Sequence, residues 1–413
     1  MTNKSNSILV VGFNTRPLAY SLKRAGYNVY TVDFFGDLDL YPYIDDYIIV
    51  MKTLKSNYNS LKYKYNKFLA QFAIELHRKH RDVNFFLIGS GLDDAYEERG
   101  LISEEIKSFN TIFVNNNLQV IKKSRDIMDI LELLKSNGYK CPKSYSYEKF
   151  RMLNLRLEFP FILKKIRSAG GINVFKIEDE KDITLLISNL GKKKFIPREW
   201  IIQEYIRGIP ISCTVISDGN ECEVITINRQ IIGENFLNAP KDFIYCGNIV
   251  PAGVSINEEK IISEISLFLT KKLGLKGING FDFVLKDHHP YFMECNPRIP
   301  GSIRASELVL NLNLLDLHVK CFIPNEWKNI KKLIKSVIPK KFATKLILFA
   351  PKDVEKSILQ KINNLEFVHD KSEPIKNVLR GEPLCSVLYE AESIHESFNG
   401  AKSIISQINR IIG

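Results

Sequence analysis

Residues 276–305 (KGINGFDFVLKDHHPYFMECNPRIPGSIRA) constrain the fold of this chain most, because they predict two strands joined by a tight turn. The apolar positions on one face of the first strand are Phe281, Phe283 and Leu285. Successive side chains of a strand point to opposite faces, so Asp282 faces away from this apolar layer. With the turn centred on His288, Asp282 lies directly across from Glu294, at a Cβ separation of about 4.5 to 5.5 Å.

The second strand places further polar groups beside this pair. By the same alternation Phe292, Glu294 and Asn296 share one face. The ladder ends at the following proline, and Arg298 projects from its end. Two neighbouring carboxylates repel each other unless a cation lies between them, and carboxylate and amide oxygens suit Mg²⁺ or Mn²⁺. The stretch therefore predicts a metal site formed by Asp282, Glu294 and Asn296. The alternative is an ordinary hairpin with a solvated acidic face, which has the same pattern.

Composition and size exclude several classes of protein. The chain has 413 residues, 45% of them hydrophobic, which is enough for about two to four packed subdomains. No apolar run approaches the roughly 18 to 20 residues that cross a bilayer, and the amino end lacks a signal-peptide pattern. We therefore expect a cytoplasmic protein without a membrane partner. The net charge of +11 comes from lysines spread along the whole chain, which argues against a nucleic-acid partner.

The cysteines indicate reduced thiols. All seven are scattered and form no CxxC pair, so neither a disulfide framework nor a zinc site is predicted. Cys295 follows Glu294 directly, but it belongs to the opposite strand face. We predict a core residue there rather than a nucleophile.

The amino-terminal part predicts a βαβ opening, with a β-branched strand, a helix and a second strand. A lone Gly12 in place of GxGxxG argues against dinucleotide binding. The helix start could hold an anion, so Arg16 is a candidate for a substrate carboxylate or phosphate, with an ordinary surface residue as the alternative. A later strand at 83–88 ends in Ser90 and Asp93, at the sheet edge where open α/β folds bind ligands.

A glycine-rich turn lies upstream of the hairpin. The strand FPFILKK ends in cations and leads through this turn into a returning strand. Successive N–H groups in such a turn form a nest for phosphate oxygens, and Lys164 is placed to add its charge. A flexible hairpin is the alternative, since GxxxxGK[ST] is absent. The turn consists of Arg167, Ser168, Ala169, Gly170 and Gly171.

The remaining segments predict regular elements with fewer polar signals. Residues 118–137 predict one helix, and residues 200–206 predict an apolar strand whose N–H and C=O groups suit a planar base. From about residue 323 onward, short strands and a closing helix are predicted.

The motif FDF at 281–283 followed by MECNPR at 293–298 resembles the metal-binding hairpin of the ATP-grasp ligases, which include biotin carboxylase and the formyl- and carboxyl-transferring enzymes of purine synthesis. In that superfamily the Asp, Glu and Asn ligate the Mg²⁺ of Mg-ATP, and the Arg steadies the acyl phosphate. The resemblance implies these roles for Asp282, Glu294, Asn296 and Arg298.

The resemblance extends to the nucleotide. The glycine-rich turn is similar to the ATP-grasp flap, with Lys164 matching the lysine that precedes it. The adenine-binding segment of the family implies that role for Glu204, Tyr205 and Ile206. Two positions depart from the pattern. Ile127 stands where a phosphate-binding lysine is common, for which Lys123 could substitute, and Pro210 stands where many relatives carry a glutamate for the ribose.

The resemblance implies an α/β (α+β) ATP-grasp fold. Its predicted parts are a Rossmann-like pre-ATP-grasp βαβ domain at 1–115, an ATP-grasp domain at 116–320 with lobes at 116–200 and 201–320, and a small β-rich carboxyl-terminal domain at 321–413.

The implied function is an ATP-dependent ligase that activates a carboxylate or bicarbonate as an acyl phosphate for attack by an amine, with Mg²⁺ or Mn²⁺ as cofactor. Amide formation is preferred to carboxylation. The partners expected are ATP and a small carboxylate or amine substrate, with a homodimer left open. The alternatives are a nucleotide-binding regulatory protein without turnover, and a βαβ oxidoreductase or nucleic-acid-associated protein.

Overall fold

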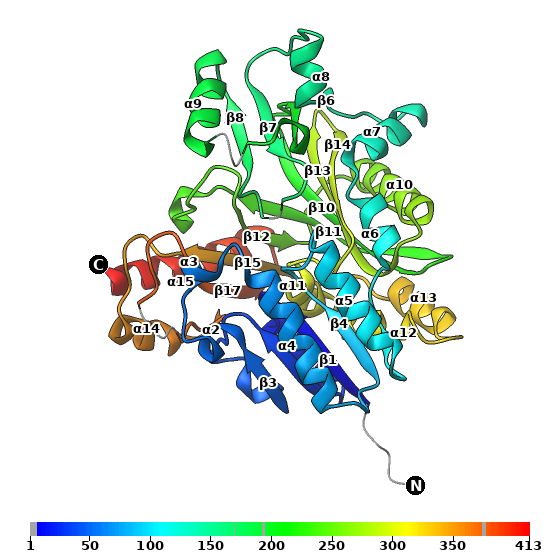
Figure 1. Ribbon diagram of the computed structural model, residues 1–413, viewed down its shortest axis with the longest axis vertical. Helices are drawn as coiled ribbons and strands as arrows, with labels where there is room; N and C mark the ends of the chain where they lie inside the picture. Colours follow the sequence, from blue (N-terminus) through cyan, green and yellow to red (C-terminus); the bar gives the residue numbers. More distant parts are fainter. Residues whose placement is uncertain (1–5, 169, 192–194, 374–376) are drawn as a thin grey trace.

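The computed structural model describes residues 6–168, 170–191, 195–373 and 377–413, and three sheets organise this part of the chain (Figure 1). The first sheet is formed by the amino-terminal part, the second stands apart at the top of Figure 1, and the third is the longest. The mixture of one parallel and two antiparallel sheets confirms the predicted α/β (α+β) class.

The first sheet is parallel, with strand order β3-β2-β1-β4-β5. Its strands are β1 (Ser7–Gly12), β2 (Asn28–Asp33), β3 (Asp46–Ile49), β4 (Phe85–Ile88) and β5 (Ile112–Phe113), and the helices against it include α1 (Arg16–Arg24), α4 (Tyr65–Lys79) and α5 (Tyr96–Lys107). Strand β1 is buried along its whole length, which explains its continuous apolar run. Ile8 packs with α1 on one face, and Leu9 packs with α4 on the other.

The second sheet is antiparallel, with order β6-β9-β7-β8. Its strands are β6 (Ser144–Ser146), β7 (Phe161–Lys165), β8 (Val174–Ile177) and β9 (Trp200–Glu204), and α8 (Tyr147–Met152) and α9 (Glu180–Leu190) pack beside them. Trp200 is fully buried and anchors the small core of this lobe. The glycine-rich turn connects β7 to β8, so this lobe carries it.

The third sheet is antiparallel, with order β14-β13-β10-β11-β12-β15-β17-β16. Its strands are β10 (Ile209–Asp218), β11 (Cys222–Ile232), β12 (Tyr245–Val250), β13 (Lys276–Lys286), β14 (His289–Asn296), β15 (Phe342–Phe349), β16 (Val368–His369) and β17 (Pro383–Ala391). The strands of the predicted carboxyl-terminal domain thus continue the sheet that carries the hairpin. Helix α10 (Ile256–Leu273) covers the hairpin half, and α14 (Lys356–Asn363) and α15 (Ile394–Ile412) cover the other half.

The helix predicted over 118–137 is interrupted. Helix α6 (Leu118–Ser124) ends, and α7 (Ile127–Ser136) begins after two residues. Asp126 caps the second helix, since its carboxylate accepts a hydrogen bond from the N–H of Asp129 at 3.2 Å. The prediction of one continuous helix is wrong because this cap restarts the helix and leaves Arg125 between the two segments.

The remaining helices connect strands that belong to the same sheet. They include α2 (Val50–Thr53), α3 (Tyr58–Leu61), α11 (Ile303–Leu310), α12 (Leu314–Lys320) and α13 (Trp327–Ser336). Within the described ranges, none of the helices has the length and hydropathy needed to cross a bilayer. All seven cysteines are free thiols, and Cys295 is buried in the core beneath α10, as predicted.

Candidate active site

The hairpin of β13 and β14 places Asp282 opposite Glu294, which confirms the predicted pairing. The turn differs from the prediction. It is formed by Asp287 and His288, with φ of 49° and 61°, so that Lys286 pairs with His289. If this pairing continued without interruption along both strands, Met293 would lie opposite Asp282. A bulge next to Asp282 shifts the register by one residue and restores the carboxylate pair.

The bulge also separates Phe292 from the site. Phe292 is fully buried and packs against Phe283 with ring centroids 5.8 Å apart, in the core beneath the sheet. The prediction that Phe292 and Glu294 share a strand face is therefore wrong. The extra residue in β14 interrupts the alternation between these two positions.

An amide joins the two carboxylates. The Nδ2 atom of Asn296 donates to Asp282 Oδ2 at 2.9 Å and to Glu294 Oε1 at 3.1 Å, and Gln230 Nε2 donates to Asp282 Oδ1 at 3.1 Å. Burial and the neighbouring charge of Glu294 raise the pKa of Asp282 well above its ordinary value. Because two such carboxylates repel, the site gains stability from a proton or a cation between them.

Lys164, at the end of β7, lies beside this pair. Its Nζ donates to the backbone carbonyl of Met293 at 3.3 Å. Burial lowers the pKa of Lys164 to about 8, and the charges of Glu294 and Asp282 offset only part of that effect. The lysine is thus held against the hairpin by the lobe that carries the glycine-rich turn.

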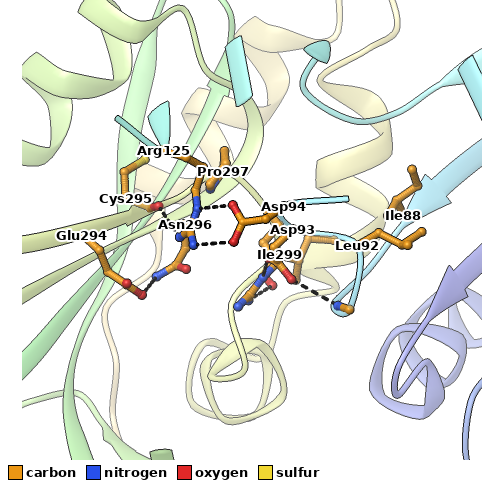
Figure 2. Close-up of polar contacts among 12 residues, drawn as sticks. Ile88, Leu92, Asp93, Asp94, Arg125, Glu294, Cys295, Asn296, Pro297 and Ile299 are labelled. Atoms are coloured by element: carbon orange, nitrogen blue, oxygen red, sulfur yellow. Dashed lines mark hydrogen bonds and ion pairs between the residues drawn. The ribbon is translucent and has the colours of Figure 1, made fainter. Parts of the chain in front are cut away.

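Arg125 is the site residue that the sequence interpretation missed. Its guanidinium binds both carboxylate oxygens of Asp94, at 3.1 and 3.0 Å, and donates to the carbonyl oxygens of Ser168 at 2.8 Å and Cys295 at 3.4 Å. Figure 2 shows it between Cys295 and Asp94. The predicted substitute, Lys123, instead donates to the carbonyl of Lys272 at the surface, at 2.9 Å. Arg125 therefore brings the cation that Ile127 does not supply.

A cap signal in the sequence could have revealed Arg125. Asp126 precedes an apolar periodic run and has Asp129 three residues later, which is typical of a helix start. A helix that starts at Ile127 leaves the preceding arginine free to turn toward the hairpin.

Arg298 joins the hairpin to the first sheet. Its Nε donates to a carboxylate oxygen of Asp93, which follows β4, and its Nη1 donates to the carbonyl of Ile299 at 3.2 Å. Burial opposes ionisation of Asp93, but Arg298, Arg125 and Arg99 together hold its pKa below the ordinary value. Asp93 was predicted to lie at the sheet edge where α/β folds bind ligands. In the structure it contacts Arg298 and orients the guanidinium.

The glycine-rich turn and one member of the acidic pair, Glu294, line a small cavity of about 50 Å³. Residues from both elements that line it include Lys164, Ser168, Gly170, Gly171 and Glu294, together with Arg125. Gly171 has φ of 78°, and a Cβ there would lie 1.7 Å from the carbonyl oxygen of Phe243. Only glycine therefore allows the turn to approach the third sheet this closely.

Other predicted nucleotide contacts lie outside this cavity. The guanidinium of Arg167 lies over the ring of Tyr96, at 4.7 Å from its centroid. The carboxylate of Glu204 accepts a hydrogen bond from the N–H of Lys143 at 3.0 Å, and Lys176 lies over the ring of Tyr205 at 5.2 Å. Neither these residues nor Ile206 line the 50 Å³ cavity. Ala169 lies outside the described residues.

Arg16 does not present a free charge. It is buried, with its Nε 2.6 Å from a carboxylate oxygen of Asp370 and 3.5 Å from one of Asp39. The predicted role of Arg16 in holding a substrate anion has no support from this geometry, because both carboxylates already neutralise the guanidinium.

The hairpin residues fit a divalent ion that takes some of its ligands from the protein and the others from a nucleotide. Over the described ranges, no three His, Cys, Asp or Glu side chains are grouped as a metal site. Two carboxylates and one amide form an incomplete ligand set, which suits Mg²⁺ because this ion commonly takes its other ligands from water and phosphates. Burial and the charge of Glu294 raise the pKa of Asp282, so a divalent ion at this pair would favour the ionised form of both carboxylates.

Comparisons with known proteins identify the family and the fold. The family described as the ATP-grasp domain matches residues 125–302. An uncharacterized protein of Methanocaldococcus jannaschii is 30% identical over 391 residues, which is 92% of this chain and 87% of that protein. The D-alanine–D-alanine ligase of Christiangramia forsetii is 25% identical over 187 residues, or 44% of this chain and 56% of the ligase.

Solved structures with the same fold include an ATP-binding carboxylase. The structure of a biotin carboxylase–βγ-ATP complex from Campylobacter jejuni superposes with a TM-score of 0.70 and 16% identity, over 98% of this chain and 95% of that one. The fold and the site define an ATP-grasp protein. This chain belongs to the ATP-grasp family, and the resemblance drawn from its sequence is confirmed.

Proposed function

We propose that this protein is an ATP-dependent ligase that converts a carboxylate into an acyl phosphate and joins it to an amine, releasing ADP and phosphate. The observation that carries the proposal is the cavity in which Glu294, paired with Asp282, faces Lys164 and the glycine-rich turn. Membership of the ATP-grasp family supports ATP as the activating substrate. A relative named for joining two D-alanines supports formation of an amide.

The phosphates of ATP would lie between the glycine-rich turn and the hairpin. The turn offers N–H groups, while Lys164 and Arg125 supply positive charge from two sides. A phosphate close to Lys164 favours its charged form, which offsets the lowered pKa of this lysine. The residues that would hold Mg²⁺ or Mn²⁺ are Asp282, Glu294 and Asn296. Such an ion supplies charge neutralisation for phosphoryl transfer.

The acyl phosphate would form beside Arg298. Asp93 fixes the orientation of its guanidinium, so the charge is in place when the amine attacks and an oxyanion develops. Preorganised charge of this kind supplies most of the catalysis in phosphoryl and acyl transfer, and no side chain has to act as a nucleophile. The substrates implied are a small carboxylate and an amine, with bicarbonate as the alternative carboxylate.

Isotope transfer tests the reaction directly. Purified protein is incubated with ATP, Mg²⁺, and a panel of ¹⁸O-labelled carboxylates paired with amines, and ADP and phosphate are measured. An acyl phosphate intermediate moves one carboxylate oxygen into the phosphate, so ¹⁸O must appear there in step with ADP. Glu294→Gln should abolish the signal, whereas Asp287→Asn, at the exposed turn of the same hairpin, should retain it. ATP binding without ADP release across the panel would favour the regulatory alternative.

A further inference from the structure

A second cavity, of about 190 Å³, lies between the first domain and the carboxyl-terminal strands. It is lined by residues of the α2–α3 region on one side and by the segments around β17 on the other, which lie side by side at the left of Figure 1. Its lining shares no residue with the cavity of the candidate active site. Because a cavity of about 150 Å³ accommodates benzene, this one has room for a ligand slightly larger than that.

Asp37 is the unusual group in this lining. It is 8% exposed, and within the described ranges its carboxylate accepts no hydrogen bond, although buried carboxylates ordinarily do. Asp33, by contrast, accepts from the N–H groups of Thr15 and Gly36, at 2.6 and 2.7 Å. Asp37 is therefore a buried acceptor whose polar atoms are left to the cavity.

The local charge balance is negative. Arg16 is the cation among the largest charge interactions of Asp37, but it is already bound by Asp370 and Asp39. At the cavity rim, Glu373 is neutralised by Lys52 at 2.6 Å. The charged or titratable groups that interact with Asp37 or share its cavity include Asp33, Asp39, Asp370, Arg16, Cys385, Lys55, Glu373, Glu382 and Tyr58. Of these, Lys55 is exposed, so solvent screens its charge.

Aromatic rings form part of the wall. Phe35 and Tyr58 both line the cavity and stack on each other, with ring centroids 6.4 Å apart and an interplanar angle of 27°. Ring faces attract organic cations, and a buried carboxylate supplies the counter-charge. This combination differs from the hard ligands of the hairpin, because one carboxylate in a cavity lined by aromatic rings suits an ammonium better than a metal ion.

We propose that this cavity is a binding site for a small organic ammonium, with Asp37 as its counter-ion and Phe35 and Tyr58 as its apolar wall. The site is separate from the nucleotide cavity and binds without ATP. It lies where the first domain meets the carboxyl-terminal strands, so an occupied cavity ties these two parts of the protein together.

Calorimetric titration of the full-length protein with benzylammonium tests this proposal. Benzyl alcohol is the matched neutral probe and benzoate the matched anion. Benzylammonium should bind at least about ten-fold more tightly than benzyl alcohol, and benzoate should not bind. Its affinity should rise from acidic to neutral pH, because Asp37 binds the cation only when ionised. Equal binding of the two probes by the wild-type protein, or no binding of benzylammonium, would overturn the proposal.

The variant Asp37→Asn should remove the preference for benzylammonium while leaving the weaker binding of benzyl alcohol. The control Asp287→Asn removes the same charge at an exposed turn and should leave both affinities unchanged. Should Asp37→Asn fail to fold, Tyr58→Leu in the wall provides a second test and should weaken benzylammonium binding. An undiminished preference in a folded Asp37→Asn protein would refute the assignment of Asp37.

Discussion

The candidate active site and the cavity beside Asp37 both bury carboxylates, and they differ in what surrounds them. In the hairpin, Asp282 and Glu294 oppose each other, joined by an amide and facing Lys164. Where the first sheet meets the carboxyl-terminal strands, Arg16 pairs with Asp370 and Asp39, and the Asp37 carboxylate has no hydrogen-bond or ion-pair partner among the described residues. The two proposed ligands differ for this reason, because opposed carboxylates suit a divalent ion, whereas a single carboxylate in a cavity lined by aromatic rings suits an organic ammonium.

The largest expected effect is that of Glu294→Gln. Removing one of two opposed carboxylates eliminates a proposed metal ligand, so we expect kcat to fall by roughly 100-fold or more. Steady-state ADP release measures the effect. In the same assay Asp37→Asn should show full activity at saturating substrate. An equal loss of kcat in both variants would contradict our assignment of different roles to the two acidic sites.

Gly171→Ala should have the next largest effect. A Cβ at this position would lie 1.7 Å from the carbonyl oxygen of Phe243, so the turn cannot keep its place over the cavity. We expect the KM for ATP to rise about ten-fold or more, because the phosphates lose their N–H donors. Gly170→Ala is the matched control, since φ is also positive but the space around it is open. The two variants should therefore differ clearly in KM.

Arg125→Lys should weaken ATP binding by about ten-fold, because lysine cannot make the two-pronged contact with Asp94 or reach Ser168 and Cys295 together. Nucleotide titration monitored by fluorescence or calorimetry measures the change. Lys123→Met should leave the affinity unaltered, since Lys123 bonds to a backbone carbonyl at the surface. A loss on Lys123→Met with none on Arg125→Lys would reverse our assignment of the missing cation.

The smallest expected effect is on stability. Burial and neighbouring acids raise the pKa of Asp37 above its unfolded value of about 3.9, so its ionisation destabilises the folded protein as pH rises above that value. Asp37→Asn should therefore increase the free energy of unfolding by about 1 to 2 kcal/mol near neutral pH. The gain should vanish below the unfolded pKa, where both states are protonated. Urea unfolding of both proteins near neutral pH and at a pH below about 3.9 measures whether Asp37→Asn stabilises the protein only at the higher pH.

Local alternation allowed the hairpin to be predicted. Phe281, Phe283 and Leu285 are buried on one face because the extra residue of the bulge lies in β14 and leaves the alternation of the first strand intact. The bulge itself has no strong sequence signal, so the position of Phe292 was mispredicted while the pairing of Asp282 with Glu294 held. The prediction placed the turn wrongly and left out the bulge. Each of these errors shifts the pairing by one residue, in opposite directions, so Asp282 still lies opposite Glu294.

Non-local packing was not available from the sequence. Residues 118–137 have a helical apolar pattern throughout, which hid the break at Arg125, and only contact with Asp94 and Cys295 gives that arginine its role. Similarly, no local pattern places β15 next to β12, so the joining of the carboxyl-terminal strands to the long sheet emerged only in three dimensions. The pairing of Arg16 with Asp370 spans most of the chain and was equally hidden.

The central claim is that the paired acids of the hairpin hold a divalent ion together with a nucleotide. Water-proton relaxation by Mn²⁺, measured with the non-hydrolysable nucleotide AMP-PNP, tests it most directly. We predict an enhancement for wild-type protein well above that of Mn²⁺ with either component alone, lost in Glu294→Gln and kept in Asp287→Asn. An enhancement that survives in Glu294→Gln, or its absence from the wild-type protein, would contradict the account.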